Sequence, residues 1–349
     1  MSEARALIAE SVERLFAGSV GPDAIATAET GAWPAALWNA TEELGLGRAL
    51  LDPDHGGAGG DWLDVFEIAR AAGRHSLPLP LVETILGTWL LERAGLDVPD
   101  GPVGLVPVPI DPENRAPLGR IPWGRHCAHL VGLVPSGTSA RVARVPRLGA
   151  AVETGRNLAL DARDTITLGD APPALGDVEI PARTIEVYGA LLRCGQMIGA
   201  LERILDQSVQ YARERKQFER AIGSFQIIQQ ELARLAGQVA EATMATEIAF
   251  RAAAEANDGS PARIGAPGDP TFEVACAKIV VGDAAELGPR IAHQVHGAIG
   301  FTYEHSLHFA TRRLWAWRAE FGSSERWATE LGSRVQEAGG DIWALVTAR

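Results

Sequence analysis

The spacing of apolar residues changes twice along this chain of 349 residues. Up to about residue 98, apolar side chains recur every three or four positions, which is the spacing of one helix face. Residues 101–182 instead hold 11 of the 21 prolines, and short apolar runs such as 130–134 and 140–145 alternate there with Gly, Pro and Asp turns. From Ile185 the helical spacing returns. Because helices and strands need different periods, the pattern predicts a small β-domain between two helical regions.

These changes of period predict an α+β chain with three domains. The predicted N-terminal helical domain covers residues 1–100, a shortened middle β-domain of six or seven strands covers 101–182, and a C-terminal helical bundle covers 183–349. In the bundle the sequence predicts helices at about 185–213, 225–256, 272–286, 289–296, 307–319 and 324–338, with a connecting loop at 257–270.

Charge and cysteine usage narrow the class of protein. The chain has 32 Lys and Arg against 44 Asp and Glu, a net charge of -12, so nucleic acid and anionic membrane surfaces are not expected partners. Its three cysteines are isolated, without the CxxC spacing of a zinc site or the pairs of a disulfide framework. The N-terminus lacks an apolar signal segment. We therefore expect a cytoplasmic protein.

Four histidines are close together near the C-terminus. They form two HxxH pairs, His293 with His296 and His305 with His308. A metal site needs further ligands, and no HExxH or ExxH carboxylate accompanies either pair. We therefore expect no metal.

Two other segments have a more specific composition. The first is Arg215-Lys-Gln-Phe218 followed by residues 222–226, where a guanidinium can bind a pyrophosphate and a nearby ring can stack on adenine. The second is 294–302, where small residues allow backbone N–H groups to approach an anion closely. Taken singly, a solvated basic helix end and a helix-ending glycine turn explain these segments as well.

Taken together, and in this order, the segments resemble the acyl-CoA dehydrogenase family. The resemblance covers nearly the whole chain: the segment WNATEELG at 38–45 and HGGAG at 55–59, RKQF with IGSFQ, QVHGAIGFTYE at 294–304, and FGSSER at 321–326. It implies an N-terminal helical domain, a middle β-domain and a C-terminal four-helix bundle, assembled as a dimer of dimers. Members bind FAD at a subunit interface and desaturate the Cα–Cβ bond of a CoA thioester. A glutamate removes the α-proton, and flavin N5 takes the β-hydride.

The resemblance also implies which residues contact the cofactor. By position, the contacts to an FAD that is bound mainly by a neighbouring chain are Arg215, Gln217, Phe218, Ile222, Phe225, Gln294, Gly297 and Ala298.

The sequence departs from the family at the catalytic base. The family places its glutamate just before a C-terminal Gly-Thr, where this chain has Phe321, or on the first bundle helix, where it has Gly189. Glu320 and Glu186 are close to these positions, but neither coincides with one, and Phe and Gly cannot accept a proton. The flavin-covering segments of the middle domain also have no convincing counterpart, and residues 123–125 are the nearest remnant. We therefore predict no catalytic residue in this chain.

These departures predict a subunit that is active only with a partner. In an α2β2 heterotetramer, a catalytic subunit would supply the base, most of the flavin cleft and the contacts to the acyl-CoA, and electrons would pass to an acceptor of the electron-transfer flavoprotein type. Such pairs act on bulky CoA esters, including steroid side chains. Two alternatives remain: a complete homomeric dehydrogenase that uses Glu320 or Glu186, and a flavin-free scaffold. Other flavin chemistry on the same fold, of the hydroxylase or nitroalkane oxidase type, stays open as well.

Overall fold

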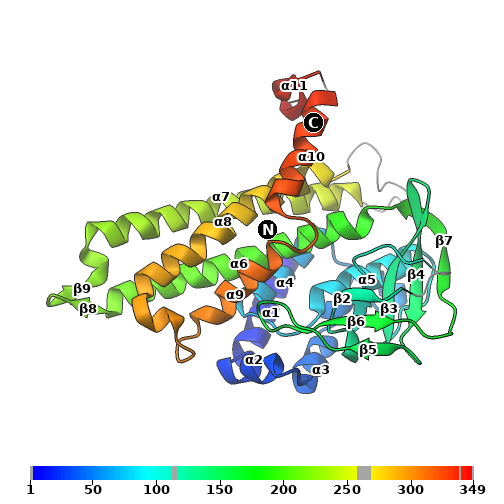
Figure 1. Cartoon of the computed structure of the whole chain (residues 1–349), viewed down its shortest axis with the longest axis horizontal. Helices are drawn as coiled ribbons and strands as arrows, with labels where there is room; N and C mark the ends of the chain where they lie inside the picture. Colours follow the sequence, from blue (N-terminus) through cyan, green and yellow to red (C-terminus); the bar gives the residue numbers. More distant parts are fainter. Residues whose placement is uncertain (1–2, 112–115, 258–268, 338, 348–349) are drawn as a thin grey trace.

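A computed structural model describes residues 3–111, 116–257, 269–337 and 339–347, and it has the predicted α+β fold (Figure 1). The loop predicted at 257–270 falls mostly outside these residues. The N-terminal region consists of helices, whose bounds are α1 Glu3–Ser19, α2 Pro22–Glu29, α3 Ala35–Glu43, α4 Trp62–Arg74 and α5 Leu81–Arg93. Every residue of α5 from Leu81 to Leu91 is buried, Glu83 included, because this mostly apolar helix lies between its neighbouring helices and the sheet.

Helix α4 begins after a capping residue, Asp61. The Asp61 carboxylate accepts hydrogen bonds from the backbone N–H groups of Leu63 and Asp64, and the Asp64 side chain in turn accepts one from the N–H of Asp61. This reciprocal capping satisfies donors that a helix start otherwise leaves without partners. The glycine run that precedes it is therefore a loop between helices.

In the described residues of the middle region, 103–111 and 116–181, seven strands form two sheets. Their bounds are β1 Val103–Leu105, β2 Leu118–Pro122, β3 His129–Ser136, β4 Ser139–Pro146, β5 Ala151–Glu153, β6 Arg163–Thr167 and β7 Ala174–Pro181. One sheet has the order β1-β3-β4-β7 and the other β2-β6-β5. A small core that includes Ile121, Leu130 and Ile166 joins the two sheets. This matches the six or seven short strands that the turn-rich sequence predicts.

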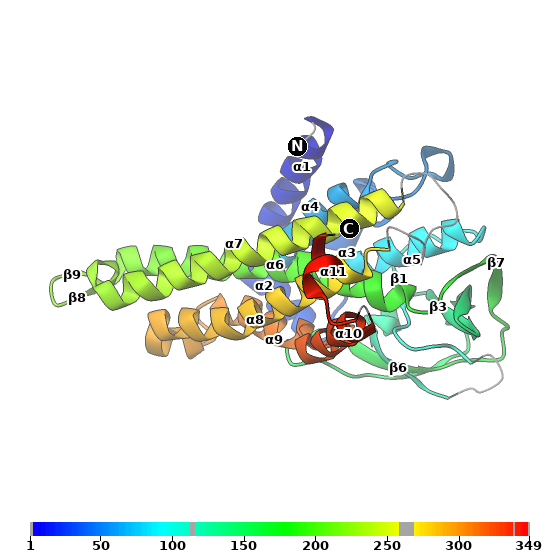
Figure 2. The same ribbon diagram turned by 90° about the horizontal axis from the view of Figure 1, so that it is seen from above.

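The C-terminal region is a helical bundle around α6. Its elements are α6 Thr184–Glu214, the short strands β8 Lys216–Gln217 and β9 Arg220–Ala221, α7 Gln226–Ala256, α8 Thr271–His296, α9 Leu307–Trp317, α10 Ser324–Glu337 and α11 Ile342–Thr347. Helix α6 packs against α4, α7, α8 and α9. At the crossing of α4 and α6, a side chain at Gly73 or Gly199 would collide with the backbone of the other helix. The β8–β9 tip lies at the end of the bundle far from the sheets (Figure 2).

One predicted boundary is wrong. The sequence predicts a helix ending at Glu286 and another beginning at Pro289, but α8 runs without a break from Thr271 to His296. Proline inside a helix removes a hydrogen bond, yet Gly288 and Pro289 are buried, and a Cβ at Gly288 would lie 2.9 Å from a Leu201 methyl group. Tight packing against α6 and α7 therefore outweighs the local preference. In the described ranges, no helix is both long and apolar enough to cross a bilayer.

Candidate functional site

The structure brings all eight predicted flavin contacts around one open hollow of about 650 Å³, which we call the distal hollow. It lies where α6 ends, α7 begins and α8 ends, beside the β8–β9 tip. Its walls are formed by Tyr211, Arg215, Gln217, Phe218, Ile222, Phe225, Ile227, Ile228, Gln294, Val295, His296, Gly297, Ala298 and Ile299. The two segments that the sequence singles out thus meet in space.

The tip of this hollow has a strained backbone. Strands β8 and β9 are joined by Phe218 and Glu219, which both have positive φ, 51° and 66°. A two-residue hairpin of this kind favours Asn-Gly, because residues with a Cβ are disfavoured in the left-handed region. The turn holds the Phe218 side chain 86% exposed, and the Phe225 ring lies 6.3 Å away between centroids. Strain that presents an aromatic ring to solvent is typical of a binding surface.

Arg215 supplies the cationic group of the distal hollow. It caps the C-terminus of α6 and is exposed, and its carbonyl accepts a hydrogen bond of 2.8 Å from the N–H of Ile222. The helix ends of α6 and α8 carry partial negative charge, whereas the start of α7 carries partial positive charge. At the C-terminus of α8, Gly297 has φ 63°, and no atom lies within 4 Å of a Cβ added there. A guanidinium, an open glycine turn and the exposed Phe218 ring together suit a phosphate group with an attached heteroaromatic ring.

The four histidines pack beside this hollow with aromatic neighbours. His296 stacks on Tyr211 at 4.6 Å and meets His305 edge-on at 4.7 Å, and His293 stacks on Phe301 at 4.5 Å. Burial lowers the pKa of each of these histidines and of His308. In the described part of the chain, no three His, Cys, Asp or Glu side chains converge as a metal site would require.

The two positions where the family keeps its base lie in direct contact. A Cβ added to Gly189 would lie 2.5 Å from the Phe321 ring, so the aromatic side chain occupies the space that a residue at 189 would need. Phe321 itself has φ 56°, and its carbonyl accepts a hydrogen bond of 3.0 Å from the Trp327 indole. This hydrogen bond anchors the strained backbone at Phe321. Apolar groups occupy both base positions.

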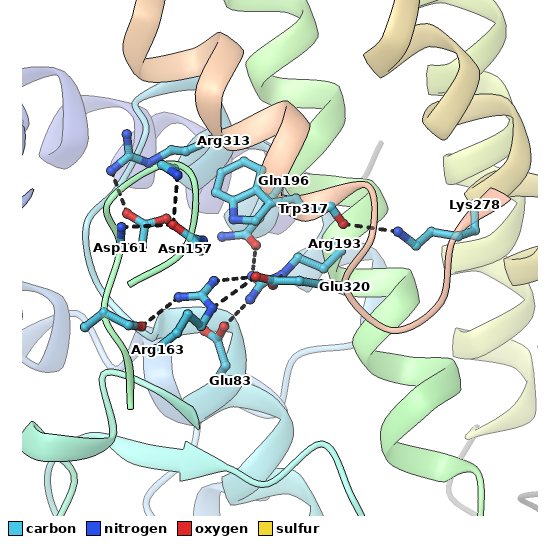
Figure 3. Close-up of polar contacts among 12 residues, drawn as sticks. Glu83, Asn157, Asp161, Arg163, Arg193, Gln196, Lys278, Arg313, Trp317 and Glu320 are labelled. Atoms are coloured by element: carbon cyan, nitrogen blue, oxygen red, sulfur yellow. Dashed lines mark hydrogen bonds and ion pairs between the residues drawn. The ribbon is translucent and has the colours of Figure 1, made fainter. Parts of the chain in front are cut away.

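Glu320, next to Phe321, is tied into a buried ion cluster. Figure 3 shows its carboxylate between two guanidinium groups: Oε1 lies 2.8 Å from Nη2 of Arg163, and Oε2 lies 2.7 Å from Nε of Arg193. Arg193 also pairs with Glu83 on α5. Burial raises the pKa of Glu320, but the two arginines outweigh it and lower the pKa to about 2. Both oxygens are engaged, so Glu320 is an ionised structural anion.

Glu186 has a different environment. It lies in the first turn of α6, where Oε2 accepts a hydrogen bond of 2.9 Å from Nε of Arg183 and Oε1 pairs with Arg326 on α10. Together with Phe321 it lines a hollow of about 450 Å³ between the β-domain and the bundle, which we call the interdomain hollow. Of the two glutamates near the base positions, Glu186 alone lines this hollow.

Sequence reasoning missed the buried cluster that holds the three regions together. Arg163 comes from β6, Arg193 from α6 and Glu83 from α5, and a second pair joins Arg313 to Asp161 at 2.8 Å (Figure 3). The available signal was the presence of single charges inside otherwise apolar helical stretches, since buried charges need partners. Trp123, the remnant of a flavin-covering segment, packs instead against Trp33 at 5.8 Å.

Comparison with known proteins establishes the family. The acyl-CoA dehydrogenase N-terminal domain matches residues 2–97, and the acyl-CoA dehydrogenase C-terminal domain matches residues 187–335. The acyl-CoA dehydrogenase IpdE2 of Mycobacterium tuberculosis is 28% identical over 331 residues, which cover 89% of this chain and 91% of the relative. This chain therefore belongs to the acyl-CoA dehydrogenase family, whose members are flavin-dependent oxidoreductases acting on the CH–CH bond of acyl-CoA.

Solved structures share the fold over almost their whole length. A chain of the ChsE4-ChsE5 complex from Mycobacterium tuberculosis superposes with a TM-score of 0.82 at 19% identity and covers 97% of this chain and 98% of its own. A chain of the Tcur3481-Tcur3483 steroid ACAD superposes with the same TM-score at 18% identity; the match covers 97% of this chain and 99% of that one. At identities below 20%, this similarity shows that the fold is shared and shows nothing about activity.

Proposed function

We propose that this chain is the base-lacking subunit of a heteromeric acyl-CoA dehydrogenase of the α2β2 type. The catalytic partner supplies the general base, the contacts to the thioester and most of the flavin cleft. This chain contributes the distal hollow to the partner's FAD. Electrons leave through an acceptor of the electron-transfer flavoprotein type.

The observation that carries this proposal is the packing of Phe321 on Gly189. A general base must lie within hydrogen-bonding reach of the proton that it removes. Here a ring and a bare backbone take both positions, and the adjacent Glu320 is held by Arg163 and Arg193 with its pKa near 2. A buried carboxylate that two arginines hold in place, outside the interdomain hollow, is not positioned to take a proton from a substrate there.

The distal hollow supports the second half of the proposal. Arg215 would bind the FAD diphosphate, the open turn at Gly297 would let backbone groups approach it, and the exposed Phe218 would offer a face to the adenine. FAD, when bound, supplies the hydride acceptor for oxidation of the Cα–Cβ bond. Phe321 packs on Gly189 near the start of α6, whereas Arg215 caps the far end of this helix of 31 residues. This chain's contacts would therefore serve a flavin whose reactive ring lies in another subunit; Figure 2 shows how far the β8–β9 tip lies from the sheets.

A bulky substrate is the third part of the proposal. One structural neighbour is named as a steroid ACAD, and both neighbours described above are named as complexes of two gene products. Two flavin sites per four chains leave room for one subunit's cleft to widen around a polycyclic acyl group. We propose steroid side-chain CoA esters as the substrate class.

Coexpression with an acyl-CoA dehydrogenase chain that retains the glutamate base tests the proposal. The two chains should copurify, and the complex should contain one FAD per two chains, measured by flavin absorbance against quantitative amino-acid analysis. The chain alone should be colourless and inactive. One FAD per chain, or a yellow and active homomer, contradicts the proposal.

Glu186 supports a second candidate, a complete homomeric dehydrogenase. Its carboxylate lines the interdomain hollow beside Phe321, so release from Arg183 and Arg326 would free it for proton abstraction. A Glu186→Gln variant discriminates between the two functions. The homomer requires a loss of turnover by several orders of magnitude, whereas the heteromer retains its turnover. A third possibility is that this chain is a flavin-free scaffold. In that case a substitution of Arg215 should leave the FAD content of the complex unchanged.

A further inference from the structure

A short turn that forms part of the wall of the distal hollow packs directly on two histidines. This turn, η5 Gly297–Phe301, follows α8, and its first three residues line the hollow. A Cβ added to Gly300 would lie 2.9 Å from the Cβ of His296 and 3.3 Å from Nδ1 of His293. Phe301 stacks on His293 at 4.5 Å between ring centroids. The position of this part of the wall therefore depends on the two histidine rings.

His296 is held in one protonation state by its surroundings. Its Nδ1 lies 2.7 Å from the carbonyl oxygen of Ala292, which can only accept a hydrogen bond, so Nδ1 carries the proton of the neutral ring. The other ring nitrogen, Nε2, is buried and has no hydrogen-bond partner among the described residues. His296 is 3% exposed, and its ring contacts those of Tyr211 and His305 at 4.6 and 4.7 Å between centroids. A second proton would make this ring a buried cation with an unpaired N–H.

The charged groups around His296 are mostly cations, or carboxylates that have other partners. On α6, the carboxylate of Asp206 pairs with Arg74 at 2.7 Å, and that of Glu214 accepts a hydrogen bond from Gln210. Helix α7 contributes apolar side chains to the surfaces on either side of the ring. The other titratable and charged groups nearby are Tyr211, Arg203, Arg213 and Arg215 at α6, His293 on α8, the exposed Glu304, and His305, His308 and Arg312 before and on α9, with Glu29 of α2 paired to Arg312.

A second proton on His296 therefore favours an open turn. Burial lowers the pKa of this ring, and the adjacent His305 and His293 lower it further. An open turn lets water reach Nε2, and the pKa then returns toward its ordinary value of 6.5. For a ring that is neutral while the turn is closed, a fall from pH 7.5 to pH 5.0 raises the ratio of open to closed turns up to about 30-fold.

We propose that His296 is a positioning residue of the distal hollow: its neutral ring holds the turn 297–301 in place, and a second proton on the ring releases the turn. The effect on FAD rests on the proposed function, because it requires that the distal hollow contacts the partner's flavin. On that basis, acid weakens the hold of this chain on FAD. The movement of the turn itself needs neither flavin nor partner.

Hydrogen exchange of the full chain, followed by mass spectrometry at pH 7.5 and pH 5.0 and corrected for the intrinsic exchange rate, tests the proposal. We expect peptides that cover 297–301 to lose protection about tenfold or more at pH 5.0. Peptides from the buried helix α5 should keep their protection. An equal loss in both segments indicates global unfolding and overturns the inference, as does a turn whose protection does not change.

His296→Phe separates the packing of the ring from its titration. Phenylalanine keeps a ring against Tyr211 but cannot take a proton, so the loss of protection at pH 5.0 should shrink about fivefold or more. His129→Phe is the matched control, because His129 of β3 also has an unpartnered ring nitrogen and a pKa lowered by burial. The turn of this control should open with acid as in the wild type. His296→Gln, which is neutral at every pH, is a second variant and should behave like His296→Phe. Equal losses in His296→Phe and His129→Phe overturn the inference.

The FAD content of the reassembled complex tests the consequence for the flavin. After dialysis at pH 5.0, complexes with the wild-type chain should lose more FAD than complexes with His296→Phe, and both should keep their FAD at pH 7.5. A turn that opens with acid in the free chain, together with equal FAD contents of the two complexes at pH 5.0, contradicts the flavin contact of the proposed function. A turn that stays closed overturns the inference alone and leaves the flavin stoichiometry unaffected.

Discussion

Replacement of Glu320 by Gln separates a structural role of this carboxylate from a catalytic one. The pKa of Glu320 falls from its ordinary value of 4.5 to about 2. At about 1.36 kcal/mol for each unit, this shift corresponds to about 3 kcal/mol of stability at neutral pH. Removal of one partner from a buried ion pair costs about 3–5 kcal/mol, because the remaining charges lose their counter-ion. Both estimates agree that Glu320→Gln destabilises the chain by about 3 kcal/mol.

The pH dependence gives the sign of the effect. The folded state holds Glu320 ionised, so its contribution is fully present above pH 4.5 and is lost as the pH falls toward 2. Urea denaturation followed by tryptophan fluorescence, repeated between pH 7 and pH 3, measures it. The variant should lack this part of the acid sensitivity. Glu337→Gln, at an exposed position of α10, is the matched control and should change stability little. A loss of turnover without a loss of stability would refute the reasoning.

Three further predictions follow from the packing. Gly189→Ala should destabilise the wild-type chain by about 1–3 kcal/mol, because the added Cβ meets the Phe321 ring. In a Phe321→Ala background the same change should be neutral or stabilising. Additive effects of the two substitutions on the free energy of unfolding would contradict the contact. Glu219→Gly should stabilise the β8–β9 hairpin by about 1 kcal/mol, because glycine adopts a φ of 66° without strain. Amide hydrogen exchange at Gln217 should then become slower, and faster exchange would contradict the strain at Glu219. Burial lowers the pKa of His296, so the unfolded state binds a proton more readily and the stability of the chain falls as the pH drops below 6.5. His296→Phe should reduce this dependence of the melting temperature on pH. An unchanged dependence would contradict the role of His296.

The period of the apolar residues predicts much of the fold. The three regions and the short strands described in the middle one follow from local patterns, since propensity acts over a few residues. The continuous helix through Pro289 does not, because packing of Gly288 on Leu201 and its neighbours decides it. Local rules cannot report such a tertiary contact.

In the candidate site, too, the sequence predicts some features, whereas others depend on tertiary contacts. Arg215 and Gln294 belong to segments whose combination resembles the family, and this resemblance predicts them as flavin contacts; the fold brings them to one hollow. The contact of Phe321 with Gly189, and the pairing of Glu320 with Arg163, join residues far apart in the sequence. Spacing along the chain carries no information on such contacts, so the sequence predicts the missing base but not the ring and ion cluster that take its place.

The FAD content of the reassembled complex tests the central claim, that this chain binds its partner's flavin, most directly. Arg215→Ala removes the guanidinium of the distal hollow, and Arg213→Ala removes an exposed arginine of the same helix that lies outside this hollow. With either variant the two chains should still copurify in equal amounts. We predict that Arg215→Ala complexes lose most of their FAD, while Arg213→Ala complexes keep one FAD per two chains. Full retention of FAD in the Arg215→Ala complex would contradict the account.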